Sequence, residues 1–174
     1  MDQNTIQTGF PFISENYSET EGLRLLRGDN IAPGKTRWKN AKLWPENLLN
    51  PTIEKYHLEI NDIIIAMDRT WVKSGLKIAQ INEDDCPALL VQRVARLRPK
   101  QFVSSKFLFL RFFANDIVQY IKMIQESTTV PHISESEIGD ISILLPPYEE
   151  QEKISSWIKK ECDLIDGKIS KTID

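Results

Sequence analysis

The longest periodic pattern of apolar residues in this chain lies near its C-terminal end. After Pro146 and Pro147, a run of glutamates leads into apolar positions that recur every three or four residues. Proline favours the first turn of a helix, and carboxylates stabilise the positive end of the helix. The spacing predicts one helix of about 25 residues within 147–174, because a 3.6-residue period places these positions on one stripe. The stripe consists of Ile154, Ile158, Cys162, Ile165, Ile169 and Ile173, with Trp157 beside it.

A lone helix with such a stripe is only marginally stable in water, so the stripe favours packing against another helix. We therefore expect a contact of the coiled-coil type. We also expect two parts, a domain over 1–146 and a spacer or dimerisation helix over 147–174. The residues expected to contact a partner are Ile154, Trp157, Ile158, Ile165, Ile169 and Ile173.

Much of the preceding chain has the pattern of short strands separated by turns. The alternation over 56–60 and the continuous apolar run over 63–67 give the strongest strand signal. A continuous run predicts a strand that is covered on both faces. Asn61 and Asp62 between the two segments predict either a tight hairpin or a bend. Other β structure is expected over 1–34, 76–81, 88–98 and 141–145.

Two further stretches have helical patterns. The apolar and aromatic residues from Ser104 to Ile124 predict two helices, or one helix interrupted at Ala114 and Asn115, that pack against the sheet. The spacing of Ser134 and Glu137 is that of a capping box and predicts a short helical turn. The expected fold is therefore a mixed α/β domain, rich in β structure and with packed helices, followed by a long helix.

Composition places the chain among single-domain proteins. Its 174 residues with 41% hydrophobic content suffice for one core and an extension. No stretch has the apolar length of a membrane span, and the N-terminus does not have the pattern of a secretion signal. We expect a soluble, cytoplasmic protein without a membrane partner. Cys86 and Cys162 have no metal-site spacing and are expected to be reduced thiols.

The net charge of −3 by itself argues against a nucleic-acid partner, but the distribution of charge along the chain points the other way. Segments 35–44, 69–77 and 93–122 together hold 14 basic residues and one acidic residue, which leaves −16 for the rest of the chain. A protein with one basic face binds phosphate locally although it is acidic as a whole. The alternative is that these charges form only solvated loops and faces.

Two of the basic segments also carry tryptophan. Cations neutralise phosphates, and an indole packs on sugar or base, so both segments suit a DNA contact. Arg69 has the geometry for a bidentate contact with guanine, although Asp68 can instead pair with it and hold the loop's shape. Trp44 is expected in the core, and Trp38 in the core or on the surface. The candidate DNA-binding residues are Lys35, Arg37, Trp38, Lys39, Lys42, Arg69, Thr70, Trp71 and Lys73.

Several spaced segments resemble one protein family. Leu-Pro-Pro-Tyr-Glu-Glu-Gln-Glu-Lys-Ile at 145–154 and Thr-Val-Pro-His-Ile-Ser at 129–134 look like the close of a target-recognition domain in type I restriction-modification specificity (S) subunits. Full-length members carry two recognition domains and two long helices, whereas this chain has room for one of each, as in a half-subunit. Further similar segments are 9–12, 25–31, 61–65 and 90–93.

The resemblance implies a function. In the family, each recognition domain reads one half of a bipartite DNA site, the helices set the gap, and separate subunits supply adenine methylation and ATP-driven restriction. The expected partners are double-stranded DNA, the methyltransferase (M) subunits and, through them, the restriction (R) subunits. A homodimer through Ile158, Ile165 and Ile169 would give a two-fold symmetric site. The alternative is an adapter or decoy that pairs through its helix without reading DNA.

The residues do not favour catalysis by this chain. Pro146-Pro147-Tyr148 is similar to the Asn-Pro-Pro-Tyr motif of adenine methyltransferases, but Leu145 has no polar group to hold the target amine. The seven glycines are scattered, without a turn for S-adenosylmethionine or a P-loop. His57 suits a strand better than a metal site, and His132 has no nucleophile nearby in the sequence. We expect a non-catalytic protein without cofactor or metal.

Overall fold

Strand β6 (Ile63–Ala66) lies at the centre of the fold. The computed structural model describes residues 6–126 and 131–173, without the side chains of 166 and 169–173. β6 pairs antiparallel with β11 (Val94–Leu97) on one side and with β9 (Ile78–Gln80) on the other. β1 (Ile6–Thr8) pairs with the outer side of β11 and completes a four-stranded sheet.

The two faces of β6 are covered by different layers. Ile63 and Ile65 belong to a hydrophobic cluster with residues of the helices, such as Phe112. Ile64 and Ala66 belong to a second cluster on the other face. All four side chains of β6 are fully buried, so the predicted strand with two covered faces is confirmed.

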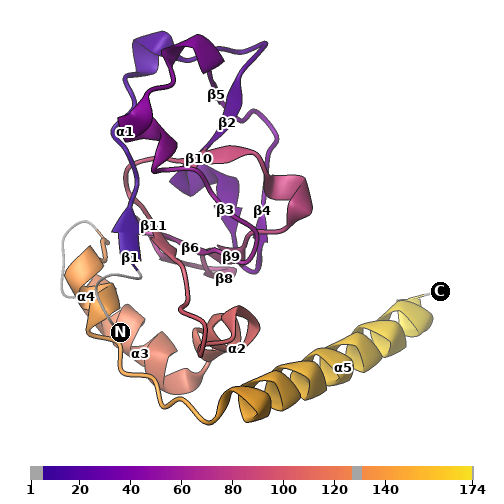
Figure 1. The fold of residues 1–174 in the computed structure, drawn as a ribbon. Coiled ribbons are helices and arrows are strands. Elements are labelled where there is room, and N and C mark those ends of the chain that lie inside the picture. The colour runs from indigo at the N-terminus through magenta and orange to yellow at the C-terminus, as the bar shows by residue number, and fades with distance from the viewer. Residues whose placement is uncertain (1–5, 127–130, 174) are drawn as a thin grey trace.

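Helices cover the first face of this sheet (Figure 1). α2 is capped by the Ser104 hydroxyl, and a new helix begins at Asn115, so the prediction of two helices is confirmed. α4 starts with the capping box of Ser134 and Glu137, as the spacing predicts. The bounds of these helices are Ser105–Arg111 for α2, Asn115–Glu126 for α3 and Glu135–Gly139 for α4.

The second face supports a smaller layer. In it, β2 lies between β10, to which it runs parallel, and β5, to which it runs antiparallel. Trp44 is buried here, as expected, against Phe12 and Tyr17. The short hairpin of β3 with β4 extends from this core, whereas the hairpin of β7 with β8 packs on the helical face through Trp71 and Leu76. The bounds are β2 (Leu23–Leu26), β3 (Ile31–Ala32), β4 (Lys35–Thr36), β5 (Leu43–Trp44), α1 (Pro51–Glu54), β7 (Trp71–Val72), β8 (Gly75–Leu76) and β10 (Ala88–Leu90).

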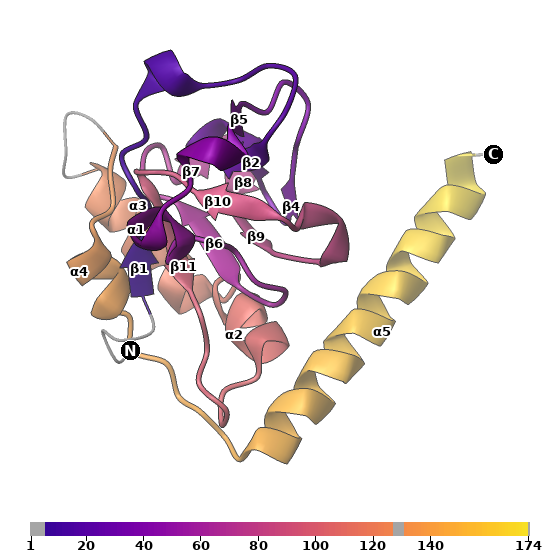
Figure 2. The ribbon, with the colours of Figure 1, turned by 45° about the horizontal axis from the view of Figure 1, so that its top comes forward.

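A long helix, α5 (Tyr148–Ile173), extends away from the domain (Figures 1 and 2). Its first turns lie beside α2, and the helix then leaves the domain. Pairing of the coiled-coil type and the division at 146/147 stay predictions. Among the described residues, no helix is both long enough and apolar enough to span a membrane.

Three strand predictions are wrong in detail. The 88–98 segment is two strands separated by a turn at Arg93, whose φ is 63°. Arg93 therefore lies in the turn between the end of β10 and the start of β11. The 56–60 segment makes one bridge, between His57 and Leu89, and a bend at Asn61 (φ 75°) leads into β6, so no tight hairpin forms.

The alternating segment 141–145 is not a strand either. Ile141 is buried and Ile143 packs against the core, whereas Leu144 is 90% exposed. The segment thus runs over the surface with two anchoring side chains. Its alternation reflects this anchoring and not a hydrogen-bonded ladder.

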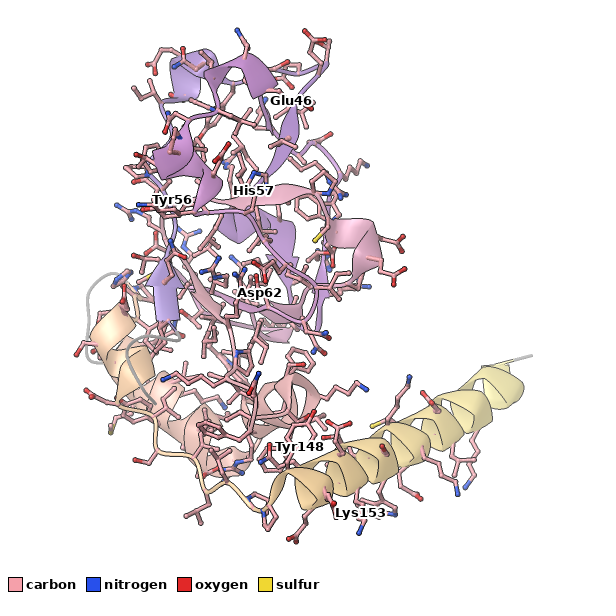
Figure 3. The ribbon with its side chains drawn as sticks, in the orientation of Figure 1. Glu46, Tyr56, His57, Asp62, Tyr148 and Lys153 are labelled. Carbon is pink, nitrogen blue, oxygen red and sulfur yellow. The ribbon has the colours of Figure 1, made fainter. Side chains whose placement is uncertain are left out.

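An ion pair between the buried Asp62 and the half-buried Arg98 connects the start of β6 to the end of β11. Asp62 is 1% exposed, and its carboxylate accepts hydrogen bonds from Arg98 Nε at 2.7 Å and Nη2 at 2.8 Å (Figure 3). It also accepts the backbone N–H of Glu59 at 2.8 Å. Replacing the carboxylate leaves both a cation and an amide without this acceptor.

We predict that Asp62→Ala lowers the free energy of unfolding by about 2 kcal/mol, because the half-buried Arg98 guanidinium and the Glu59 N–H lose their buried acceptor. Urea denaturation followed by circular dichroism measures the change. Glu59→Ala is the matched control, since it removes an exposed carboxylate that contacts the same Arg98 and should have a clearly smaller effect. Equal losses in the two variants would contradict the assignment.

Candidate nucleic-acid interface

A groove of about 810 Å³ lies at the edge of the domain where several strands end. Its lining includes the carboxylates of Glu19, Asp29 and Asp68 and a larger number of cations. We call it the basic groove. Its cationic residues are Arg27, Lys42, Arg69, Lys77 and Arg93.

The strand pairing brings these residues together from distant parts of the sequence. Arg27 directly follows β2, and Arg93 lies in the turn after β10, which runs parallel to β2. Arg69 lies in the loop after β6, and Lys77 separates β8 from β9. Side chains at strand ends are held by a rigid scaffold while they stay accessible, which is a common arrangement for binding residues.

Asp68 organises one side of the basic groove. Its carboxylate binds Arg93 Nη1 at 2.8 Å and His132 Nδ1 at 2.7 Å. Burial raises the pKa of Asp68, but hydrogen bonds from Arg93 and His132 lower this pKa by more, so it lies below the ordinary carboxyl value. Asp68 therefore pairs with Arg93 and not with Arg69, which was the alternative considered for the loop.

Arg69 and Lys77 are the cations of the groove that keep their charge available. Within the described part of the chain, neither side chain forms an ion pair. Arg69 is exposed and has a φ of 48°. Burial lowers the pKa of the Lys77 ammonium, against the opposing effects of Asp29 and Asp68. A partly desolvated cation without an ion pair favours an incoming anion.

The two other cations have exposed partners. Lys42 forms an ion pair with Glu19, and Arg27 Nη2 lies 3.5 Å from Asp29. Pairs of this kind contribute roughly 0–1 kcal/mol, because water screens them. A phosphate can therefore replace either carboxylate at little cost.

The basic groove includes two of the nine residues that the sequence predicted for DNA binding, Lys42 and Arg69. Lys73 is exposed at the tip of the β7–β8 hairpin. Lys35, Arg37 and Lys39 are also exposed but do not line the groove.

The other three predicted residues make internal contacts. Thr70 is fully buried, and its hydroxyl donates to the Met67 carbonyl, which corrects the expectation that its side chain lies on the surface. Trp38 is half-buried and donates its Nε1–H to Asp85 at 2.7 Å. The guanidinium of Arg24 lies over its ring, 4.4 Å from the ring centre. Trp71 is half-buried and packs against the helical core, with Lys122 4.3 Å from the centre of its ring.

Residues of α5 differ in what they offer to a partner. Ile154 and Ile158 are half-buried, whereas Trp157 is 63% and Ile165 54% exposed. Leu164, which was missed in the sequence, is 50% exposed and lies seven residues after Trp157, so the two share one face. The side chains of Ile169 and Ile173 lie outside the described residues.

Arg27, Lys77 and Arg93 were also missed as binding residues. Each had a signal: Arg27 ends an apolar run, Lys77 belongs to a basic segment, and Arg93 interrupts an apolar face. Their convergence was not visible, because it depends on which strands pair. Among the described residues, no group of three or more His, Cys, Asp or Glu side chains is arranged to hold a metal ion.

These features define a class: a mixed α/β domain with a cationic groove built from strand-end loops, and a helix that leaves the domain. Residues 13–173 match the family described as type I restriction modification DNA specificity domain, and the chain belongs to this family.

Two relatives support this assignment. The chain is 39% identical over 153 residues to the specificity subunit of the type I restriction enzyme EcoAI from Escherichia coli, covering 85% of this chain and 25% of that protein. It is 30% identical over 164 residues to the MjaVIII specificity subunit from Methanocaldococcus jannaschii, covering 94% and 38%. The chain thus spans between a quarter and two fifths of the length of these relatives.

Solved structures share the fold. A chain from a study of the assembly and conformational transition of the type I R-M system aligns with a TM-score of 0.67 at 16% identity, covering 93% of this chain and 36% of that chain. The HsdS subunit from Thermoanaerobacter tengcongensis aligns with a TM-score of 0.61 at 14% identity, covering 95% and 37%. The mixed α/β fold expected from the sequence is confirmed.

The ion pair between Asp68 and Arg93 predicts a pH dependence. A carboxylate with a lowered pKa stabilises the fold at neutral pH, and this contribution disappears as the pH falls through the folded-state pKa. Because the pKa of Asp68 is lowered, the coupling should persist down to about pH 4, the ordinary carboxyl value, and vanish only below it.

A double-mutant cycle of Asp68→Asn and Arg93→Gln, measured by urea unfolding between pH 7 and pH 2.5, isolates this coupling from other titrations. The coupling should be favourable and constant at neutral pH and should weaken only after the pH has fallen below about 4. A coupling that is already lost at about pH 5 would contradict the lowered pKa of Asp68.

Proposed function

We propose that this chain is the DNA target-recognition module of a type I restriction-modification system and reads one half of a bipartite target. The observation that carries the proposal is the basic groove, in which Arg69 and Lys77 are available to an anion in a family described by its DNA specificity. The adapter or decoy alternative is not favoured, because it gives this groove no role.

The groove suits DNA in both charge and chemistry. Its lysines and arginines can neutralise phosphates locally although the chain carries a net charge of −3. Arg69, exposed at the end of a rigid strand, can present its guanidinium to the O6 and N7 of guanine. Arg93 is better suited to hold the backbone, since its orientation is constrained by Asp68.

The proposed role of α5 is that of a spacer and docking surface. The exposed face of Trp157, Leu164 and Ile165 is large and apolar, which favours burial against another helix. That helix belongs either to a second copy or to the second half of a longer specificity subunit. Methyltransferase subunits, and through them restriction subunits, complete the proposed assembly, and this chain itself contributes recognition without catalysis.

The direct test is a map of methylated adenines in a host that carries the cognate methyltransferase, with and without this chain. A new two-part motif that appears only with the chain supports recognition, and a symmetric motif supports pairing of two copies. If no new motif appears although the chain copurifies with the methyltransferase, the chain is either an incomplete half or an adapter.

We predict that Arg69→Ala weakens binding to a duplex with the mapped motif by about 1–3 kcal/mol and relaxes specificity at one base pair. Lys77→Ala should instead weaken binding to all sequences and reduce the slope of log K against log salt by about 0.9, the loss of one phosphate contact. Fluorescence anisotropy at several salt concentrations separates the two effects.

Lys153→Ala is the charge-matched control for both variants. Lys153 is exposed on α5 (Figure 3) and does not line the basic groove, so its removal should leave affinity and salt slope unchanged. A loss of affinity in Lys153→Ala equal to that in Lys77→Ala would mean that only net charge matters and that the groove is not the site.

The apolar face of α5 predicts self-association that depends on it. Ile158→Asp together with Ile165→Asp should abolish dimers in sedimentation velocity, because two carboxylates would have to be buried in the contact. Ser156→Asp with Lys159→Asp places the same groups at two exposed polar positions on the other side of α5 and should leave the sedimentation profile unchanged. A double isoleucine variant that still sediments like the wild type would exclude the dimer.

A further inference from the structure

The base of α5 contains a polar side chain that is buried almost completely. Gln151 is 1% exposed, on the first turn and a half of a helix whose other side chains are largely exposed. Glutamine is rarely buried to this degree, and a buried amide is costly unless its hydrogen bonds are satisfied. The contacts of Gln151 therefore indicate what it does.

The Gln151 amide joins three backbone groups that belong to two different segments. Oε1 accepts the N–H of Ser104 at 2.8 Å, and Nε2 donates to the carbonyl of Phe102 at 3.1 Å. Nε2 also donates to the carbonyl of Pro146 at 2.8 Å. One side chain thus connects α5 to the loop before α2 and to its own lead-in segment.

Neighbouring contacts lie on the same side of the helix. The Ser155 hydroxyl donates to the Gln151 carbonyl at 2.7 Å, and Ser155 is buried. Glu152 accepts a hydrogen bond from the hydroxyl of Ser104, which is the N-cap of α2. The first turns of α5 are therefore fixed to the start of α2 through directional bonds, not only through apolar contact.

This attachment is confined to the base of the helix. After Ile158, every described side chain of α5 is exposed, and the helix diverges from the domain (Figures 1 and 2). From Gln151 to the end of the helix is about 33 Å at 1.5 Å per residue. A 10° tilt at the base thus displaces the far end by about 6 Å, or nearly two base pairs of DNA at 3.4 Å each.

We propose that Gln151 is a positioning residue that fixes the direction of α5 relative to the recognition domain. This part of the inference rests on the proposed function: the direction of α5 sets which separation of the two half-sites the assembly accepts. Gln151 does not touch DNA in this account. It acts through the helix, by holding the backbone at Phe102 and Ser104 against the start of α5.

The direction of α5 can be measured without DNA. Spin labels on native Cys162, exposed on α5, and on Glu83→Cys, exposed on the domain, report the distance between the two parts by double electron–electron resonance. Cys86→Ser removes the other thiol and keeps a hydroxyl that can donate to the Leu58 carbonyl as the thiol does. The parent protein should give one narrow distance distribution.

Gln151→Met keeps the length of the side chain and removes its hydrogen bonds. We expect it to broaden the distribution and to shift its mean by up to about 3 Å for each 10° of tilt, because Cys162 lies about 17 Å along the helix from Gln151. Gln119→Met is the matched control, because Gln119 is exposed on α3 and hydrogen-bonds to Asn115 of the same helix, and it should leave the distribution unchanged. An unchanged narrow distribution in a folded Gln151→Met protein overturns the proposal.

If Gln151→Met does not fold, the distance distribution of Gln151→Glu tests the proposal instead. It keeps the acceptor for the Ser104 N–H but places a carboxylate against the carbonyls of Phe102 and Pro146, so the distribution should broaden. A narrow, unshifted distribution in Gln151→Glu overturns the proposal equally.

A second readout concerns DNA. In the assembled methyltransferase, Gln151→Met should keep the two half-sites and lose the preference for one separation, so that sites with one or two base pairs more or fewer are methylated at comparable rates. Unchanged spacing preference despite a broadened distribution would overturn the link to DNA. If the parent protein itself directs no methylation, the proposed function fails, while the label distances still decide the role of Gln151.

Discussion

The burial of β6 on both faces is the constraint on which the rest of the structure depends. Ile63, Ile64 and Ile65 each contribute roughly 1.5–3 kcal/mol only if a layer covers their side of the sheet. One strand therefore requires the helical layer on one face and the smaller β layer on the other. The same strand ends at Ala66, so the loop that carries Asp68 and Arg69 follows closely on a rigid, fully buried strand.

The fixed pairing of the strands determines where the charges of the basic groove lie. The chain is acidic as a whole, yet its paired strands bring five cations to one edge. Asp68 neutralises part of this charge and at the same time orients Arg93, whereas Lys77 loses solvent and gains no ion pair among the described residues. Ion pairs thus neutralise only part of the positive charge in the groove. The positive charge that stays unpaired among the described residues lies at Arg69 and Lys77.

Local patterns predicted local structure well. The apolar run at Ile63, the capping box at Ser134 and the helical periodicity of α5 each concern residues close in the sequence, and each element is present. The groove could not be derived in this way, because the parallel pairing of β2 with β10 is not encoded in either segment alone. The direction of individual side chains also could not be predicted from the sequence. Thr70, a polar loop residue, is buried and donates to a backbone carbonyl, and Gln151 is buried although its neighbours in the sequence are charged.

The position of the groove at strand ends has a consequence for how such a protein diversifies. Substitutions of exposed loop residues usually change stability by no more than about 0.5 kcal/mol, whereas the core tolerates little change. Arg69 and Lys73 belong to the first kind of position and Ile64 to the second. Under the proposed function, inherited variation can accumulate in the contact surface and yield new target preferences while the scaffold and its helix persist unaltered.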